Sequence, residues 1–408
     1  RRMQRNLNGE NNMTNRERER RTLNFQKPEG RGAVEETFYP WSLTAQRYKE
    51  EGIPKDLADR VTAAAAGMLK DTDIATEKYF PVAWGDSILE YEQFLGFDPV
   101  RRTQFVLPFR RLEEKILEVT PEYTIKQDSC GRQMIRKKDS QWDLEHRQVI
   151  ECWEDWKKLK EHALKELESY TDDQIDKAYS PLKEGHDRGD YSIRLHMEGF
   201  FWTPRELLGF EPVLYAFYDE PELLHDINDF ICKVYKEKAM KVFAFIQPDV
   251  VYFNEDLSGV NGPLISPECF DEFVGAYYKE LIPLMKEKGV GNVIVDTDGE
   301  FSKLIPNFLK CGVDGFLPMD VNAGMDIVKI REMFPRLKFI GGYNKLRIAE
   351  GREAIDREFE RILPVIRGGG YIPGADHQVP PSASLKDYRY YIERLKQVME
   401  QAGADLPG

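Results

Sequence analysis

The chain has 408 residues, of which 41% are hydrophobic and 32% are charged, and its formal net charge is −13. This length fits one large barrel with additions, or two domains. No apolar run approaches the roughly 18 residues that a membrane span needs. The acidic balance argues against nonspecific binding of nucleic acid. We therefore expect a globular protein with neither a membrane nor a nucleic acid as partner.

Two features indicate a cytoplasmic protein. The N-terminus is polar and rich in Arg, and it lacks the apolar core of a signal peptide. The five cysteines are scattered, and none forms a C-x-x-C pair. We interpret them as reduced thiols that are mostly buried as small hydrophobic side chains.

The N-terminal region, 1–25, is predicted to be a polar tail followed by an opening helix. Its first twelve residues are expected to be flexible, and Thr14 has the position of a helix cap. The remaining residues, 26–408, are expected to form one domain. That domain begins with a barrel strand at 33–39.

The segment near 100–185 is predicted to decorate the barrel. Short alternating runs at 98–137 predict antiparallel strands at the barrel mouth, and 141–188 predicts charged helices. Strand character returns at 192–199. A helix follows Pro221, and a last amphipathic helix closes the chain at 386–401.

Five short strand-like segments in the second half each run into a polar residue or a glycine. The residues that follow them are Glu255 and Asp256, Asp296 and Asp298, Asp320, Gly341 and Gly342, and Asp376 and His377. The spacing leaves room for a helix and two loops between strands. In a parallel α/β barrel the C-terminal strand ends meet on one face. We therefore expect these acids to share one pocket, which indicates an enzyme.

Several motifs resemble the uroporphyrinogen decarboxylase superfamily, which holds porphyrinogen decarboxylases and barrel methyltransferases that move methyl groups to or from corrinoid proteins. The motifs are 201–210 (FWTPRELLGF), 261–267 (NGPLISP), 296–299 (DTDG) and 369–373 (GGYIP). The resemblance covers about 190–400 and touches the opening helix. It implies a (β/α)8 TIM barrel, often a homodimer, with a cleft at the strand C-termini.

One departure disfavours uroporphyrinogen itself as substrate. True porphyrinogen decarboxylases carry an N-terminal motif whose arginines bind the substrate carboxylates. The corresponding region here, 39–47 (YPWSLTAQR), keeps only Arg47. An acidic pocket with so few cations would repel a polycarboxylate.

A second departure concerns metal. The superfamily's thiol-activating methyltransferases bind zinc through His-x-Cys-Gly and a further Cys. Here 296–299 (DTDG) and 375–377 (ADH) occupy those positions, so a thiolate-rich zinc site is excluded. Two outcomes stay open. In the first, Asp296, Asp298 and His377 bind a metal, which is either a harder divalent ion such as Mg²⁺ or Mn²⁺ or zinc in a mixed O/N site. In the second, the carboxylates act without metal.

The candidate catalytic residues are Asp296, Asp298, His377 and Glu255. The two aspartates lie two apart after a strand, so both side chains can face one side, as metal ligands or as an acid–base pair. His377 follows the last strand beside a carboxylate, which is a usual acid–base or ligand pairing. For Glu255 the alternative is a loop acid bonded to backbone amides. For Asp298 the alternative is the cap of the next helix.

Other strand ends supply candidate substrate-binding residues. Trp41 and Trp202 could form an apolar wall for a substrate, although core packing is the commoner use of such rings. The polar and aromatic candidates at the remaining strand ends are His196, Asp320, Asn322, Tyr343 and Asn344.

Two functions follow from these predictions. The first is methyl transfer from a small methylated substrate or a pterin, with a corrinoid protein as partner; Asp296 or His377 would protonate or polarise the leaving group. The second is a decarboxylase, another lyase or a hydrolase that acts on a small acid or sugar-like compound; there Asp298 would protonate a developing carbanion.

Overall fold

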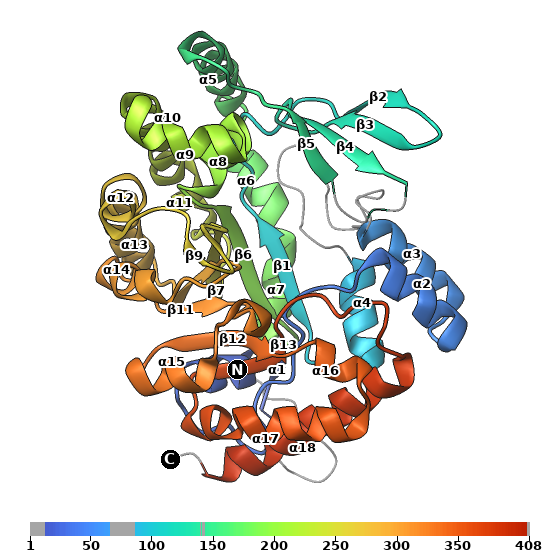
Figure 1. Cartoon of the computed structure of the whole chain (residues 1–408). Coiled ribbons are helices and arrows are strands. Elements are labelled where there is room, and N and C mark those ends of the chain that lie inside the picture. The colour runs from blue at the N-terminus through green and yellow to red at the C-terminus, as the bar shows by residue number, and fades with distance from the viewer. Residues whose placement is uncertain (1–12, 66–85, 139, 141–142, 406–408) are drawn as a thin grey trace.

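The computed structural model describes residues 13–65, 86–138, 140 and 143–405. Its centre is a seven-stranded sheet that curls around an interior (Figure 1). Neighbouring strands are parallel and follow one another in chain order, which confirms the α/β class. The strands are β1 (Val100–Gln104), β6 (Ser192–Glu198), β7 (Val250–Asn254), β10 (Asn292–Asp296), β11 (Gly315–Leu317), β12 (Lys338–Tyr343) and β13 (Tyr371–Ala375).

A complete (β/α)8 barrel is not confirmed, because the predicted first strand at 33–39 is not a strand. This segment contacts both edges of the sheet instead. The backbones of Val34 and Asp98, just before β1, bond at 2.7 Å, and Arg102 in β1 donates to the Glu36 carbonyl. The Glu36 carboxylate accepts from the backbone N–H of Ala375 in β13. Side chains thus replace much of the backbone ladder that a strand would make here.

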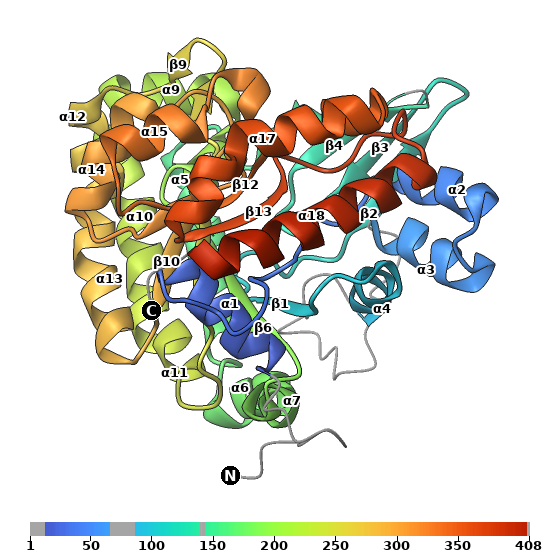
Figure 2. The ribbon, with the colours of Figure 1, turned by 90° about the horizontal axis from the view of Figure 1, so that it is seen from below.

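The opening helix has the predicted cap. The Thr14 hydroxyl accepts a hydrogen bond from the Glu17 N–H at 3.2 Å at the start of α1 (Asn15–Leu23). Figure 2 shows α1 lying across the lower end of the sheet. Leu23, its last residue, packs into the interior. The expected flexible tail, 1–12, lies outside the described residues, and the division of the chain at residue 25 remains a prediction.

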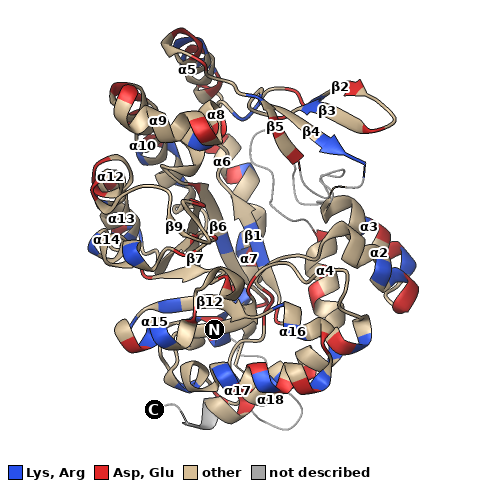
Figure 3. Ribbon diagram, in the orientation of Figure 1, with Lys and Arg blue, Asp and Glu red and all other residues tan. Residues whose placement is uncertain are grey.

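Helices cover the outside of the sheet. Their buried faces are apolar, as in α17, whose Ile355, Phe359 and Ile362 are buried, while Figure 3 shows acidic and basic residues interspersed on the outer faces of α17 and α18. The helix that the sequence predicted after Pro221 is α10, which begins at that residue. The predicted closing helix is α18. The remaining helices are α2 (Ser42–Glu51), α3 (Lys55–Ala65), α4 (Asp86–Leu95), α5 (Trp153–Leu167), α6 (Asp172–Tyr179), α7 (Lys183–Arg188), α8 (Trp202–Leu208), α9 (Phe210–Asp219), α10 (Pro221–Val234), α11 (Met240–Val242), α12 (Pro267–Phe270), α13 (Ala276–Glu287), α14 (Ile305–Lys310), α15 (Ile327–Met333), α16 (Leu346–Ala349), α17 (Arg352–Gly368) and α18 (Leu385–Asp405).

The decorating segment is present with corrected boundaries. An antiparallel sheet contains β2 (Lys115–Val119), β3 (Tyr123–Gln127), β4 (Gln133–Lys137) and β5 (Asp143–Arg147), in that order. The predicted start at 98 was wrong, because 100–104 is a strand of the central sheet; its inward Arg102 pairs with Glu92, so polar residues hide its buried character. Helix begins at Trp153 rather than 141. A short two-stranded hairpin, β8 (Ser258–Gly259) and β9 (Gly262–Pro263), follows β7.

The interior of the curled sheet is apolar in its middle. Val250, Tyr252, Ile294, Leu317, Ile340 and Ile372, from five strands, share one buried cluster. Below it lie ion pairs that join Arg194 to Glu19 and Glu35. Among the helices of the described ranges, none is both long and apolar enough to cross a membrane.

Candidate functional site

The candidate site lies at the C-terminal ends of β7 and β10, where strand alternation turns polar side chains inward. Tyr252 and Ile294 belong to the interior cluster, while Val251 and Val293 pack against the helices. Because side chains alternate along a strand, Asp296, the last residue of β10, faces the interior on the same side as Ile294. Asp256 and Asp298 follow on the loops beyond these strands.

Asp256, Asp296 and Asp298 form what we call the aspartate cluster. The backbone N–H of Asp298 donates to the Asp256 carboxylate at 3.1 Å. Asp296 is only 9% exposed, and within the described ranges its carboxylate makes no hydrogen bond or ion pair. Burial raises the pKa of Asp296 well above its usual range, and the carboxylates of Asp256 and Asp298 raise it further. The cluster therefore holds more acid than its surroundings neutralise.

Asp298 occupies the rim of this cluster. Its side chain is 41% exposed, yet one carboxylate oxygen, Oδ1, is buried without a hydrogen-bond partner in the described structure. Burial raises the pKa of Asp298 to about 7, and the charges of Asp256 and Asp320 act in the same direction. Because these carboxylates interact, the cluster titrates as a unit. Near neutral pH it can therefore both hold and release a proton.

His377 faces Asp298 from the loop after β13. Its Nε2 lies 3.6 Å from Asp298 Oδ2, slightly longer than a hydrogen bond. Burial lowers the pKa of His377 to about 4, and the ammonium of Lys345 lowers it as well. The rings of Phe38 and Trp41 pack on the imidazole, with centroids at 5.3 and 5.8 Å. A neutral imidazole thus stands beside an acid of raised pKa, against an aromatic wall.

His196 lies beneath the mouth, on β6. Its ring contacts the Tyr252 ring at 5.1 Å, and the charge of Asp296 is among the groups that raise the pKa of Tyr252. Burial lowers the pKa of His196 to about 4, and the nearby Arg110 adds to this effect. Tyr252 therefore separates a second neutral imidazole from the aspartate cluster.

Three other candidates gather around Asp376, which ties the mouth loops together. The Asp376 carboxylate accepts from the backbone N–H groups of Val321 and Lys345, from the Lys345 ammonium at 3.3 Å, and from the Asn322 amide. The amides of Asn322 and Asn344 bond each other at 3.3 Å, and Asp320 accepts from the Asn322 N–H. The structure thus brings Asp320, Asn322 and Asn344 together near the cluster, while the substrate role assigned to them remains a prediction.

Glu255 does not join the cluster. Its buried carboxylate accepts from the backbone N–H groups of Phe200, Phe201 and Trp202 and from the Tyr278 hydroxyl at 2.5 Å. Burial raises the pKa of Glu255 to about 7 despite these donors. Gly199 leaves room for the carboxylate, since a Cβ there would lie 2.2 Å from it. The alternative interpretation of a loop acid bonded to backbone amides therefore describes Glu255, and we do not carry it into the proposed site.

Tyr343 points away from the mouth. It is fully buried, its hydroxyl donates to the Ile355 carbonyl, and its ring packs on Phe359 and Tyr391 between β12 and the outer helices. The prediction that Tyr343 contacts substrate was wrong. Side chains alternate along β12, and that of residue 343 points outward to the helices, whereas that of Ile340 points to the interior.

The two tryptophans lie on different walls. Trp41 stacks on His377 beside the cluster. Trp202 begins α8, and the Arg205 guanidinium lies 5.2 Å from its ring while donating to the Asp256 carbonyl at 2.8 Å. Trp202 thus flanks the Asp256 side of the mouth.

A metal site is not formed by these residues. Within the described ranges, no group of three His, Cys, Asp or Glu side chains is arranged to hold a metal ion. At the position of the superfamily's second zinc ligand, Asp376 already has four donors, including an ammonium. The donor set therefore does not fit the relatives' zinc, and we derive no step through a metal.

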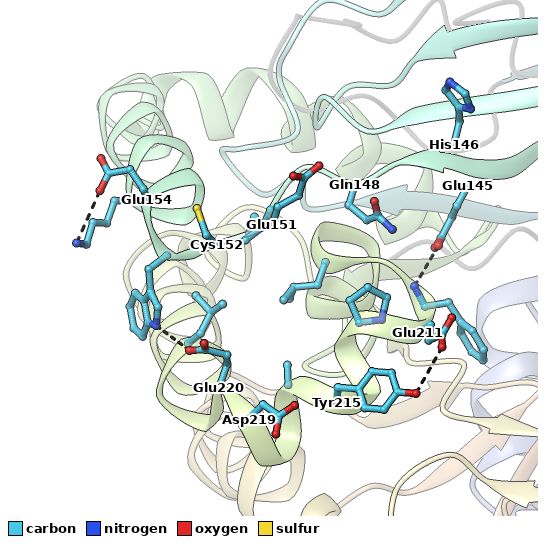
Figure 4. Close-up of a pocket in the computed structure, with 18 residues that line it drawn as sticks. Glu145, His146, Gln148, Glu151, Cys152, Glu154, Glu211, Tyr215, Asp219 and Glu220 are labelled. Atoms are coloured by element: carbon cyan, nitrogen blue, oxygen red, sulfur yellow. Dashed lines mark hydrogen bonds and ion pairs between the residues drawn. The ribbon is translucent and has the colours of Figure 1, made fainter.

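A separate cleft of about 1150 Å³ opens between the start of α5, α9 and β5 (Figure 4). Its polar side chains mostly bond within the lining, as Glu220 does with the Trp153 indole at 3.1 Å and Glu145 with the Phe210 N–H at 3.1 Å. Its one histidine, His146, is exposed at the rim and forms no hydrogen bond or ion pair with a carboxylate in the described structure. The acids and histidines that could carry chemistry are at the mouth instead.

Sequence analysis expected Asp256 in the shared pocket without choosing it as a catalytic candidate, and it missed Tyr252 and Phe38. Asp256 was part of the recognised acidic run, but Glu255 was chosen in its place. The alternation of β7 could have distinguished them, because 252, 254 and 256 share the inward parity. Phe38 had no such signal, since its segment is not a strand.

Comparisons with known proteins agree with this fold. Residues 201–398 match the family model described as Uroporphyrinogen decarboxylase (URO-D). A methyltransferase from Methanosarcina mazei superposes with a TM-score of 0.55 at 12% identity, covering 95% of this chain and 99% of that one. At such identity the likeness shows the fold alone.

A B12-independent methionine synthase from a Shewanella species aligns at 13% identity over 78% of this chain and 86% of its own, with a TM-score of 0.39. No curated protein matched the chain. The family match confirms, over residues 201–398, the resemblance to the uroporphyrinogen decarboxylase superfamily that the sequence predicted.

Proposed function

We propose that this protein is a methyltransferase that takes a methyl group from the heteroatom of a small substrate. The observation that carries the proposal is the pairing of Asp298, an acid with a pKa raised to about 7, with the neutral imidazole of His377. A corrinoid brought by a partner protein, or a pterin, would supply the methyl acceptor. The fold shared with a methyltransferase supports this choice.

In this reaction the chain's own residues manage a proton. When the methyl group leaves, its electron pair stays on the substrate heteroatom, which becomes more basic. Asp298 donates a proton to that atom, and the neutral His377, whose Nε2 lies 3.6 Å from Asp298, helps to orient the acid. A carboxylic acid whose pKa lies near the working pH suits this role. The apolar floor of Tyr252, Ile294 and Leu317 excludes water below the reacting atoms.

Decarboxylation of a small acid is the second candidate, and the family match favours it. The charge at the mouth opposes it. A substrate carboxylate would meet the aspartate cluster, while Lys345 is bonded to Asp376 and Arg110 to Glu198 and Glu206. Arg47, the remaining counterpart of the relatives' arginine motif, bonds Glu51 and the carbonyls of Pro381 and Ser382. Uroporphyrinogen would therefore find none of these cations free to bind its carboxylates.

The test is a donor screen with reduced cobalamin as acceptor. The protein is incubated with methoxylated compounds, methylated amines and methyl sulfides, and methylcobalamin is followed by its absorbance. We expect methylcobalamin from one donor class. Asp298→Asn should lower the rate about 10²–10⁴-fold, because an amide cannot donate the same proton.

The matched control is Asp173→Asn on α6, whose exposed carboxylate pairs with Lys177 on the surface. Its rate should equal that of the parent. Release of CO₂ from a small acid, without methyl transfer from any donor, would replace the proposal with the second candidate. An unchanged rate in Asp298→Asn would remove the assigned proton donor.

A further inference from the structure

Within the described structure no cation bonds a carboxylate of the aspartate cluster, although the charge of Arg205 lowers the pKa of Asp256 and that of Lys345 lowers the pKa of Asp298. Each basic group near the mouth is already engaged. The Lys345 ammonium bonds Asp376, Arg205 donates to a backbone carbonyl and lies over two aromatic rings, and Arg110 pairs with two glutamates. The cations near the mouth are therefore bonded elsewhere, and none of them is among the main groups that set the pKa of Asp296.

Asp296 is the member that marks a ligand position. Buried acids are otherwise paired or hydrogen-bonded in proteins, and an unpartnered one is costly. Asp296 is nine-tenths buried, aims into the mouth and has no partner in the described ranges. Nearby, the rings of Phe38 and Trp41 surround His377, which is itself 3.6 Å from Asp298. Carboxylates beside aromatic rings are the surroundings that methylated ammonium groups prefer.

We propose that the substrate is a small methylated onium cation, a tertiary or quaternary methylammonium, whose positive charge lies between the aspartate cluster and the Phe38–Trp41 wall. The inference rests on the proposed methyl transfer and names its substrate class. The cation provides the charge that the chain leaves out. A neutral methyl ether would leave the buried carboxyl group of Asp296 uncompensated.

The transfer step balances for this class. The C–N bond breaks with its electron pair left on nitrogen, and the methyl group bonds to the nucleophilic acceptor brought by the partner. The onium nitrogen becomes a neutral amine. It then takes a proton from Asp298, which becomes a carboxylate, and leaves as an ammonium ion. Asp296 can ionise beside the bound cation while Asp298 keeps the proton that it delivers.

Binding, measured by titration calorimetry without any acceptor, tests the inference separately from activity. The probes are choline and 3,3-dimethylbutan-1-ol, which replaces the charged nitrogen of choline by carbon. We expect choline to bind at least about tenfold more tightly than the neutral compound. Its affinity should rise between pH 6 and 8, with release of a proton, because the cation favours the ionised cluster.

Variants separate the ligand site from general surface charge. Asp296→Asn and Trp41→Leu should each weaken choline about tenfold or more, while Asp173→Asn should not change it. Thermal unfolding checks that the variants are folded. If one of Asp296→Asn and Trp41→Leu fails to fold, the other still tests the ligand site. Equal affinity for both probes, or unchanged choline binding in a folded Asp296→Asn protein, overturns the inference. Methyl transfer from ethers alone would overturn it too but would leave the proposed function intact, whereas choline binding without any transfer would do the reverse.

Discussion

The interior of the curled sheet holds two sets of buried acids that are treated in opposite ways. At the N-terminal end of the strands, Arg194 pairs with Glu19 and Glu35, and Arg102 pairs with Glu92 at 2.7 Å. At the C-terminal end, the aspartate cluster has no such arginine. Both sets are desolvated, so burial alone does not distinguish them.

The difference separates structure from function. Buried charges that only support a fold need their partners within the chain, because an uncompensated charge costs several kcal/mol. A buried acid without a partner, such as Asp296, is a cost that packing does not explain, and such groups gather at functional sites. The contrast therefore favours the C-terminal end as the place of chemistry, and substitutions at either end can test it.

The largest effect is expected at the paired end. Arg194→Leu would leave Glu19 and Glu35 buried without their cation. We expect the free energy of unfolding to fall by about 3–5 kcal/mol, measured by urea denaturation. The control is Arg347→Leu, whose exposed pair with Glu350 lies on the surface and should contribute less than about 1 kcal/mol. A loss at Arg194 no greater than that of the control would mean that the N-terminal acids are not held by charge pairing.

An intermediate effect is expected at Glu255, which is satisfied by hydrogen bonds rather than by a cation. Glu255→Gln keeps the shape but replaces one acceptor oxygen by an NH₂ group, so at least one backbone N–H among residues 200–202 loses its partner. The free energy of unfolding should fall by about 1–3 kcal/mol.

The control for Glu255 is Glu272→Gln, an exposed side chain that should change stability by less than about 0.5 kcal/mol. The prediction distinguishes two roles. A Glu255→Gln protein with parental stability but no methyl transfer would return Glu255 to the reacting groups, as the sequence first suggested.

The period of β-strands explains why some site residues were predictable and others were not. Asp296 and Asp298 lie two apart and follow a strand, so their convergence could be inferred from sequence. The alternation of inward and outward side chains, extended past the ends of β7 and β12, would have selected Asp256 over Glu255 and Asn344 over Tyr343. The parity argument fails where the chain is not a strand, which is why Phe38 was missed.

The pairing of charged side chains was less predictable from the sequence than the direction in which a strand's side chains point. The sequence shows many acids and bases, but which of them meet depends on packing between residues distant in the chain, such as Arg194 with Glu35 or Lys345 with Asp376. For the same reason β1 was assigned to the decorating segment, since its arginines look like surface residues until their buried partners are known. The α/β fold, by contrast, follows from a local rhythm of strands and helices.

The smallest expected effect concerns the unpaired end and depends on pH. Asp298 titrates near 4 when unfolded and has a folded pKa raised to about 7, so the folded state binds the extra proton between these values. Stability of the parent should therefore fall as pH rises from about 4 to 7 through this group. Asp298→Asn removes that loss, so the variant should gain relative stability across the window. Because the side chain is 41% exposed, solvent screening limits the gain to about 1 kcal/mol.

Urea denaturation of both proteins at pH 5 and pH 8 measures this difference, with Asp173→Asn as the control that should show none. The sign is what matters. A variant that becomes less stable than the parent at pH 8 would mean that Asp298 is held by a favourable partner in its ionised form, like the acids at the other end of the sheet. The cluster would then be a compensated structural network, and the argument for a ligand cation between its members would lose its basis.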